Sequence, residues 1–329
     1  QAKLDWVEKR FGDYNPYESL PKLNIYTYDL GEALGRNKYD DFDDLAFNFK
    51  EFFRTWQGSE PNFYEDSRTN DDIGTFVHEK VIIKFLNLLS NDKNETYPFS
   101  TVKYRENFRH TLWLLPGVKE AKALSKLLNE HPVFESYDIV NVAGDGDDDA
   151  EKDDALEMVR KAIGDDPTKT YTITLSCGRL TTGVTVPAWT AVLMLYGSSS
   201  TSATSYMQTI FRVQTPAIFG PKEKTNCYVF DFAPDRTLKI VAEISTNSNQ
   251  GDGSDEEYLK EFINFCPVIG LSGSQMKSFD EKELLSYFKQ HIIDKVVRNG
   301  FEDSRLYNPK LFDLSDLEIS ELKNLEKII

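Results

Sequence analysis

Two short stretches in the middle of the chain combine residue types that bind phosphate groups. The first is residues 176–187, SCGRLTTGVTVP, in which hydroxyl side chains, glycines and one arginine follow an apolar run. Such a loop can offer backbone N–H groups and hydroxyls to phosphate oxygens. The same composition also fits a polar loop that only connects two elements. Composition alone therefore leaves both interpretations open.

The second stretch is residues 202–212, which contains Gln208 and Arg212 four residues apart. In a helix this spacing places both side chains on one face. A guanidinium matches phosphate oxygens in bidentate geometry. An internal salt bridge is the other common role of such an arginine, so the pair alone does not decide between binding and structure.

The elements that must position these residues follow an alternating pattern. Apolar runs typical of strands occur at 111–115, 137–142, 171–176, 191–195 and 227–232, with helical periodicity at 118–128, 154–163 and 202–212. The run 191–195 (AVLML) is continuously apolar, as expected when helices cover both faces of a sheet. The pattern predicts an α/β fold with a parallel, doubly wound sheet, whose ligands bind beyond the carboxyl ends of the strands.

The flanking regions have a different character. We expect one strand at 22–30 and helices at 44–56, 76–89, 283–298 and 313–329. This pattern divides the chain into a connector with a helical insertion, an α/β domain and a helical accessory region, over residues 1–104, 105–245 and 246–329. The first residue is not Met and the last residues fall inside a helical pattern, so we expect a piece of a longer protein.

Composition limits the other classes of function. The net charge is −16, which argues against a protein that coats nucleic acid with its whole surface. Cys177, Cys227 and Cys266 are far apart without a C-x-x-C, which indicates reduced thiols, a cytoplasmic location and no metal site. The acidic stretch from Asp145 lacks the glycine and glutamate of a calcium loop. No run of eighteen apolar residues predicts a membrane span.

In their order, these elements resemble the second RecA-like domain of superfamily-2 helicases, particularly of the motor subunits of ATP-dependent restriction endonucleases. Residues 180–187 (LTTGVTVP) have the form of helicase motif V. Gln208 and Arg212 occupy the first two places of motif VI, Gln-x-x-x-Arg-x-x-Arg. Residues 110–128 resemble motif IV, and residues 228–232 resemble the closing strand of the domain. The resemblance covers about residues 105–240.

The resemblance implies one half of an ATP-dependent DNA helicase or translocase. No G-x-x-x-x-G-K-[ST] occurs in the chain, so ATP and Mg²⁺ would be bound mainly by a first RecA-like domain upstream, and this chain alone is expected to be inactive. The residues implied in ATP binding are Gly183, Thr185, Gln208 and Arg212, the last two with catalytic roles. The residues implied in nucleic-acid binding are Pro116, Gly117, Ser176, Arg179, Thr181 and Thr182.

One departure from the family pattern affects catalysis. Thr215 stands where motif VI has its second arginine. Either Arg212 acts alone, or Arg179 or Arg236 substitutes, or hydrolysis has been lost; we favour Arg212. The partners implied are the backbone of double-stranded DNA, the first RecA-like domain, and methyltransferase or specificity subunits, with no membrane. The alternative is a RecA-like scaffold module whose catalytic residues have decayed.

Overall fold

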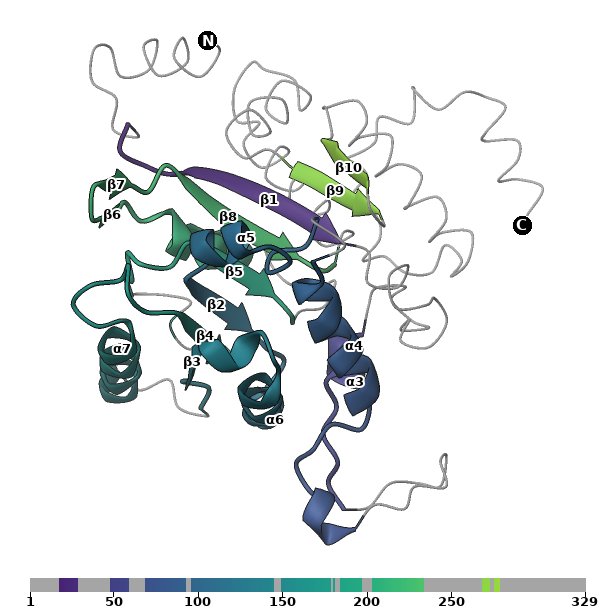
Figure 1. Cartoon of the computed structure of the whole chain (residues 1–329). Helices are drawn as coiled ribbons and strands as arrows, with labels where there is room; N and C mark the ends of the chain where they lie inside the picture. Colours follow the sequence, from purple (N-terminus) through teal and green to yellow (C-terminus); the bar gives the residue numbers. More distant parts are fainter. Residues whose placement is uncertain are drawn as a thin grey trace, which may run out of the picture.

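The computed structural model describes residues 18–28, 48–58, 69–92, 96–144, 149–178, 180, 184–196, 203–233, 268–272 and 275–278. These residues contain an eight-stranded sheet in the order β10-β9-β1-β8-β5-β2-β4-β3 (Figure 1). Neighbouring strands pair in parallel, except that β10 is antiparallel to β9. The strands are β1 Lys22–Tyr28, β2 His110–Leu114, β3 Asp138–Asn141, β4 Thr172–Ser176, β5 Ala191–Met194, β8 Asn226–Asp231, β9 Val268–Ser272 and β10 Gln275–Ser278.

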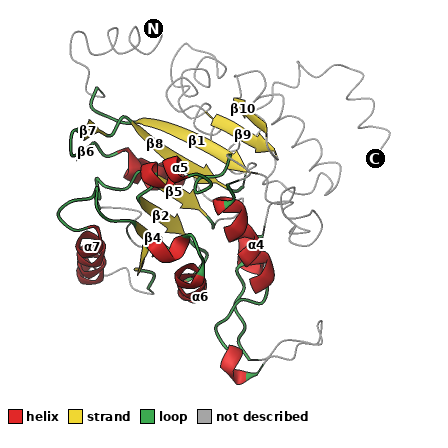
Figure 2. Ribbon diagram, in the orientation of Figure 1, coloured by secondary structure: helices red, strands yellow, loops and turns green. Residues whose placement is uncertain are grey.

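Helices cover both faces of this sheet (Figure 2). Along β2, Trp113 belongs to one hydrophobic cluster while Leu112 and Leu114 belong to another, because alternate side chains of a strand point to opposite faces. Helix α6 (Val118–Glu130) packs into the first cluster. Helices α7 (Asp149–Ile163) and α8 (Ala203–Ile210), with the 3-10 turn η3 (Phe211–Gln214), lie on the second face. The predicted α/β fold with a parallel, doubly wound sheet is confirmed.

The sheet also includes residues outside the range 105–245. Strand β1 lies between β8 and β9, and β9 and β10 extend the sheet further. Residues 268–272 and 275–278 are therefore strands, and the prediction of an entirely helical region after residue 246 is wrong there. Pairing with β1 explains the difference, because partners distant in sequence leave no local periodicity. The helices expected at 283–298 and 313–329 lie outside the described residues.

A helical arm, which we define as residues 48–58 and 69–92, extends away from the sheet (Figure 1). It contains α3 (Phe49–Phe52), the 3-10 turn η1 (Asn70–Asp72) and α4 (Glu79–Ser90). The short helix α5 (Val102–Asn107) follows and leads into β2. The predicted helix over 76–89 is confirmed, although it begins at Glu79. The helix predicted to reach residue 56 ends at Phe52, because Thr55 forms a β-bridge with Phe76.

Aromatic side chains attach the arm to the sheet. The Phe85 ring of α4 meets the Phe232 ring edge-on, with centroids 5.4 Å apart, and the Phe52 ring of α3 at 5.9 Å. All three side chains are fully buried. Phe232 directly follows β8, so α4 packs against the end of a central strand. The arm and the sheet therefore share one core.

We expect Phe85→Ala to lower the free energy of unfolding by about 3–5 kcal/mol, because it leaves a cavity between the arm and the sheet. Urea denaturation of the full chain measures the change. The control is Ile83→Ala on the same helix, where the side chain is 38% exposed. Its cost should stay below about 1 kcal/mol. Equal effects of the two substitutions would show that the arm does not share the core of the sheet.

Candidate functional site

The strand order places a topological switch point, which we call the crevice, at the carboxyl end of β2. The chain that leaves β2 enters α6 on one face, whereas the chain that leaves β4 passes to the other face, where Leu180 and Val184 are buried. The N–H of Leu115 donates to the carbonyl of Ser176 over 2.8 Å, so the two departing segments start side by side. In doubly wound sheets ligands bind where neighbouring strands send the chain to opposite faces.

Pro116 and Gly117 form one wall of this crevice. Both are half-buried, and Gly117 is the residue that caps the amino end of α6 in an extended conformation. A Cβ atom at Gly117 would collide with the carboxylate of Glu120, so a larger residue would displace that side chain. Glycine therefore allows the Glu120 side chain to fold over the first turn of the helix.

Ser176 and the residues that follow it form the other wall. Ser176 is fully buried at the end of β4. Gly178 and Leu180 both have positive φ, 123° and 63°. Leucine is rarely found in this region, so the backbone turns sharply and under strain at Leu180. The predicted site residues Arg179, Thr181, Thr182 and Gly183 lie outside the described residues, and their roles stay predictions.

Arg212 connects helix α8 to the segment between β4 and β5. Its Nε donates to the carbonyl of Gln208 over 3.0 Å, and its Nη1 donates to the carbonyl of Val184 over 2.7 Å. Within the described residues its Nη2 donates no hydrogen bond. The side chains of Gln208 and of Thr185, which follows Val184, are exposed beside this contact. The structure thus brings three predicted ATP-site residues together.

The predicted site residues fall into two groups. Pro116, Gly117 and Ser176 lie at the carboxyl ends of the strands. The η3 turn that contains Arg212 lies near the amino end of β1. The side-chain amide of Gln214 donates to the carbonyl of Pro21, the residue before β1. One continuous segment, residues 177–186, begins at the crevice and reaches Arg212 through Val184.

Two polar contacts fix the position of α8 and η3. The buried carboxylate of Asp231 accepts from the hydroxyl of Tyr206 over 3.0 Å and from the N–H of Ala233 over 2.9 Å. This contact joins the first half of α8 to the end of β8. Thr215, which occupies the place of the second motif VI arginine, donates its hydroxyl to the carbonyl of Arg212 over 3.4 Å.

Lys224 is a buried cation that sequence reasoning missed. It follows the hairpin of β6 (Ile218–Phe219) and β7 (Lys222–Glu223), and its ammonium donates to the carbonyls of Pro187, Trp189 and Thr215 over 3.0, 2.7 and 2.9 Å. Burial lowers the pKa of Lys224 to about 8. It thereby ties the segment before β5 to the residue after η3. A lone lysine in a polar hairpin gives no sequence signal of this role.

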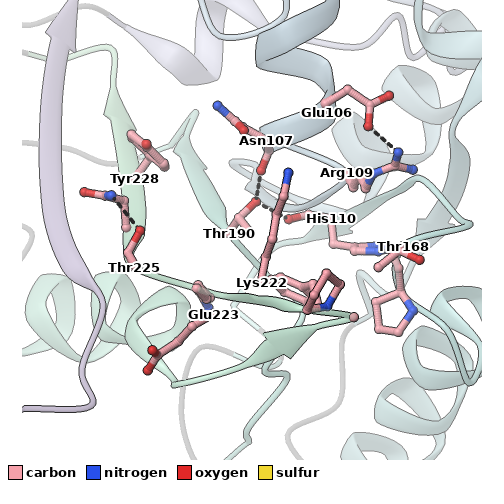
Figure 3. A pocket seen from close by; sticks show the side chains of 16 residues that line it. Glu106, Asn107, Arg109, His110, Thr168, Thr190, Lys222, Glu223, Thr225 and Tyr228 are labelled. Atoms are coloured by element: carbon pink, nitrogen blue, oxygen red, sulfur yellow. Dashed lines mark hydrogen bonds and ion pairs between the residues drawn. The ribbon is translucent and has the colours of Figure 1, made fainter.

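A polar pocket of about 580 Å³ lies at the amino ends of the strands, opposite the crevice (Figure 3). Glu106 accepts hydrogen bonds from Arg109 and Tyr171, and the Arg109 guanidinium lies 4.2 Å from the centre of the Tyr171 ring. Both ring nitrogens of His110 bond to neighbours, and burial lowers the pKa of this histidine. Its nitrogens are therefore committed to structure rather than to acid–base chemistry.

Two other features are absent from the described part of the chain. It contains no group of three or more His, Cys, Asp and Glu side chains that could hold a metal ion. None of its helices has the length and apolar character that crossing a membrane requires.

Comparison with known proteins identifies a similar sequence that is named as a restriction enzyme and methyltransferase. The chain is 28% identical over 299 residues to a Mycoplasma pneumoniae protein named as the C-terminal part of a candidate type II restriction enzyme and methyltransferase. The match covers 85% of this chain and 39% of that relative, so the chain spans about two fifths of its length. No protein-family model matches the chain.

Among solved structures, two similar chains are an ATP-dependent Type ISP restriction-modification enzyme, LlaBIII, bound to DNA, and domain 2 of the DEAD-box helicase Mss116p, bound to an RNA duplex. The first is 18% identical with a TM-score of 0.38 and covers 86% of this chain and 17% of the enzyme. The second is 12% identical with a TM-score of 0.36 and covers 84% and 74%. Likenesses with such TM-scores carry no conclusion about the fold or the function of this chain.

We expect Lys224→Met to lower the free energy of unfolding by about 3 kcal/mol or more, because three carbonyls lose their shared donor. Lys222→Met, an exposed residue of the same hairpin, is the matched control and should change stability by no more than about 0.5 kcal/mol. Thermal or urea denaturation at pH 7 provides the comparison. If Lys224→Met lowered stability no more than the control does, the three hydrogen bonds of Lys224 would not hold this region together.

The same residue predicts a pH dependence. The pKa of Lys224 is about 8 in the folded chain against 10.5 in the absence of burial. Between these values the unfolded chain binds more protons, so Lys224 makes stability rise with pH in this window and contributes no slope below it. The difference in unfolding free energy between the wild type and Lys224→Met should grow by about 1–2 kcal/mol from pH 7 to pH 9.5. A constant difference would contradict the lowered pKa.

Proposed function

We propose that this chain is the second half of the ATP-dependent DNA helicase or translocase motor of a restriction endonuclease. It would supply the arginine side of an ATP cleft and part of a DNA track. The observation that carries the proposal is the contact of Arg212 with Val184. It joins the motif VI helix to the motif V segment and leaves Nη2 without a hydrogen bond among the described residues.

The ATP side of the proposal concerns Gln208, Thr185 and Arg212. These residues offer an exposed amide, an exposed hydroxyl and a guanidinium to one wall of a nucleotide site. They fit the phosphate end of ATP, but the chain has no phosphate-binding loop, so ATP and Mg²⁺ would be held mainly by a first RecA-like domain. Arg212 would place positive charge against the transferring phosphoryl group, where charge develops in the transition state.

The DNA side concerns the crevice at the carboxyl end of β2. Its walls are Pro116 and Gly117 on one side and the segment after Ser176 on the other. Backbone N–H groups and hydroxyls bind phosphates and sugars without reading bases, so the proposed track has little sequence specificity. The sequence similarity to a protein named for restriction and methylation supports this assignment.

Coupling between the two sides would follow from segment 177–186. It starts in the crevice, and its carbonyl at Val184 accepts from Arg212. A shift of this segment on DNA binding would move the guanidinium, and closure around ATP would move the segment. The remaining length of such a protein would carry the first RecA-like domain together with methyltransferase or specificity parts.

The second candidate is a scaffold module without hydrolysis. Thr215 favours it, because its hydroxyl caps the carbonyl of Arg212 where the family places a second arginine. Under this interpretation the two hydrogen bonds of Arg212 to backbone carbonyls are its whole role. The two candidates differ in one measurable property, the dependence of ATP hydrolysis on Arg212.

We expect Arg212→Ala to lower DNA-stimulated ATP hydrolysis by about two orders of magnitude or more in the longer protein, with DNA binding retained. This chain alone should not hydrolyse ATP. Gln214→Ala is the control, because it breaks the contact with Pro21 in the same turn without removing charge, and it should lower the rate only a few-fold. Hydrolysis at the wild-type rate in Arg212→Ala would refute the motor assignment and support the scaffold.

A further inference from the structure

The solvent face of α6 is a stripe of lysines. Lys119, Lys122 and Lys126 are all exposed and follow the spacing i, i+3, i+7, which places them on one side of a helix. The opposite side is buried in the core. Glu130, the last residue, is the exposed acidic residue of this helix, since Glu120 is half-buried and folds back to Gly117. The first two turns of the face are therefore uniformly basic.

This placement opposes the electrostatics of the helix. The amino end of a helix is partially positive, so lysines near it are unfavourable and lysines near the carboxyl end are favourable. Helix α6 has no basic residue in its last turn, whereas α7 follows the rule with Arg160 and Lys161 in its last turn. In a chain of net charge −16, helix stability does not account for Lys119 in the first turn of α6.

The stripe is continuous with the crevice. Helix α6 begins directly after Pro116 and Gly117, so its positive end and its first lysine lie beside the proposed DNA track. The ammonium of Lys119 donates to the side chain of Gln57 in the helical arm over 2.7 Å, which fixes its direction. Lys122 and Lys126 form no ion pair or hydrogen bond with the described residues. Their charges are available to an anionic partner.

We propose that this face of α6 binds the sugar-phosphate backbone of duplex DNA and extends the track beyond the crevice. This inference rests on the proposed function. The three lysines span about 10 Å along the helix axis, and duplex DNA carries one negative charge per about 1.7 Å of its axis, so each ammonium can meet a phosphate. An ammonium is a point charge without base-reading geometry, so the contact is independent of sequence.

The test is the salt dependence of DNA binding by the full chain. We compare the wild type with the triple variant Lys119→Gln, Lys122→Gln, Lys126→Gln, using a labelled duplex of arbitrary sequence. Each lost phosphate contact should reduce the slope of log affinity against log salt by about 1, so the triple variant should lose about 2–3. The control variant Lys103→Gln, Lys161→Gln, Lys169→Gln removes the same charge from three exposed lysines elsewhere and should keep the slope.

Each outcome decides the proposal. Equal loss of slope in both triple variants would assign the effect to net charge and overturn the role of α6. An unchanged slope in the α6 variant would also overturn the role of α6 in DNA binding. It would favour an acidic protein as the partner of this face. If neither the wild type nor either triple variant binds DNA, the proposed function itself fails. The α6 variant should melt near the wild-type temperature, because all three lysines are exposed.

Discussion

The pairing of β2 on both of its edges is the constraint on which the rest of the structure depends. Every residue of β2 is buried, and the chain beyond it bonds to both neighbours, through Leu115 to Ser176 and through Leu114 to Leu195. Strands β4 and β5 pair with opposite edges of β2, so the chain that connects β4 to β5 must cross over β2. That crossing separates the two connections at the crevice and brings Val184 next to Arg212 of η3.

Two cations hold the described chain before β5, residues 184–190, in place. Arg212 binds the carbonyl of Val184, and Lys224 binds the carbonyls of Pro187 and Trp189. Residues 184–190 belong to no helix or strand, so regular secondary structure does not define their path. Side chains that come from η3 and from the β6–β7 hairpin define it instead. Any ligand that displaces one of these cations acts on the whole segment, which is the physical basis of the proposed coupling.

The sequence predicted those elements whose burial leaves a pattern within a few consecutive residues. Strand β5 was recognisable because burial on both faces makes it continuously apolar. The spacing of Gln208 and Arg212 predicted one helix, which the structure divides into α8 and the 3-10 turn η3. Membership of β1, β9 and β10 in the sheet depends on partners distant in sequence and was not predictable from periodicity. The same holds for the three carbonyls that accept from Lys224 and for the β-bridge of Thr55. These are tertiary contacts, which periodicity does not reveal.

Strand β1 has a consequence for the order in which the chain can fold during synthesis. Asn24 contacts Asn226, 202 residues later, and β1 pairs in parallel with β8 on one edge and β9 on the other. At about 5–20 residues per second, a ribosome needs roughly 10–40 s to supply the first of these partners. During that interval Leu23 and Ile25, both buried in the finished sheet, have no native strand beside them. The nascent chain thus carries an unpaired, aggregation-prone edge until its final third emerges, and chaperone demand should concentrate there.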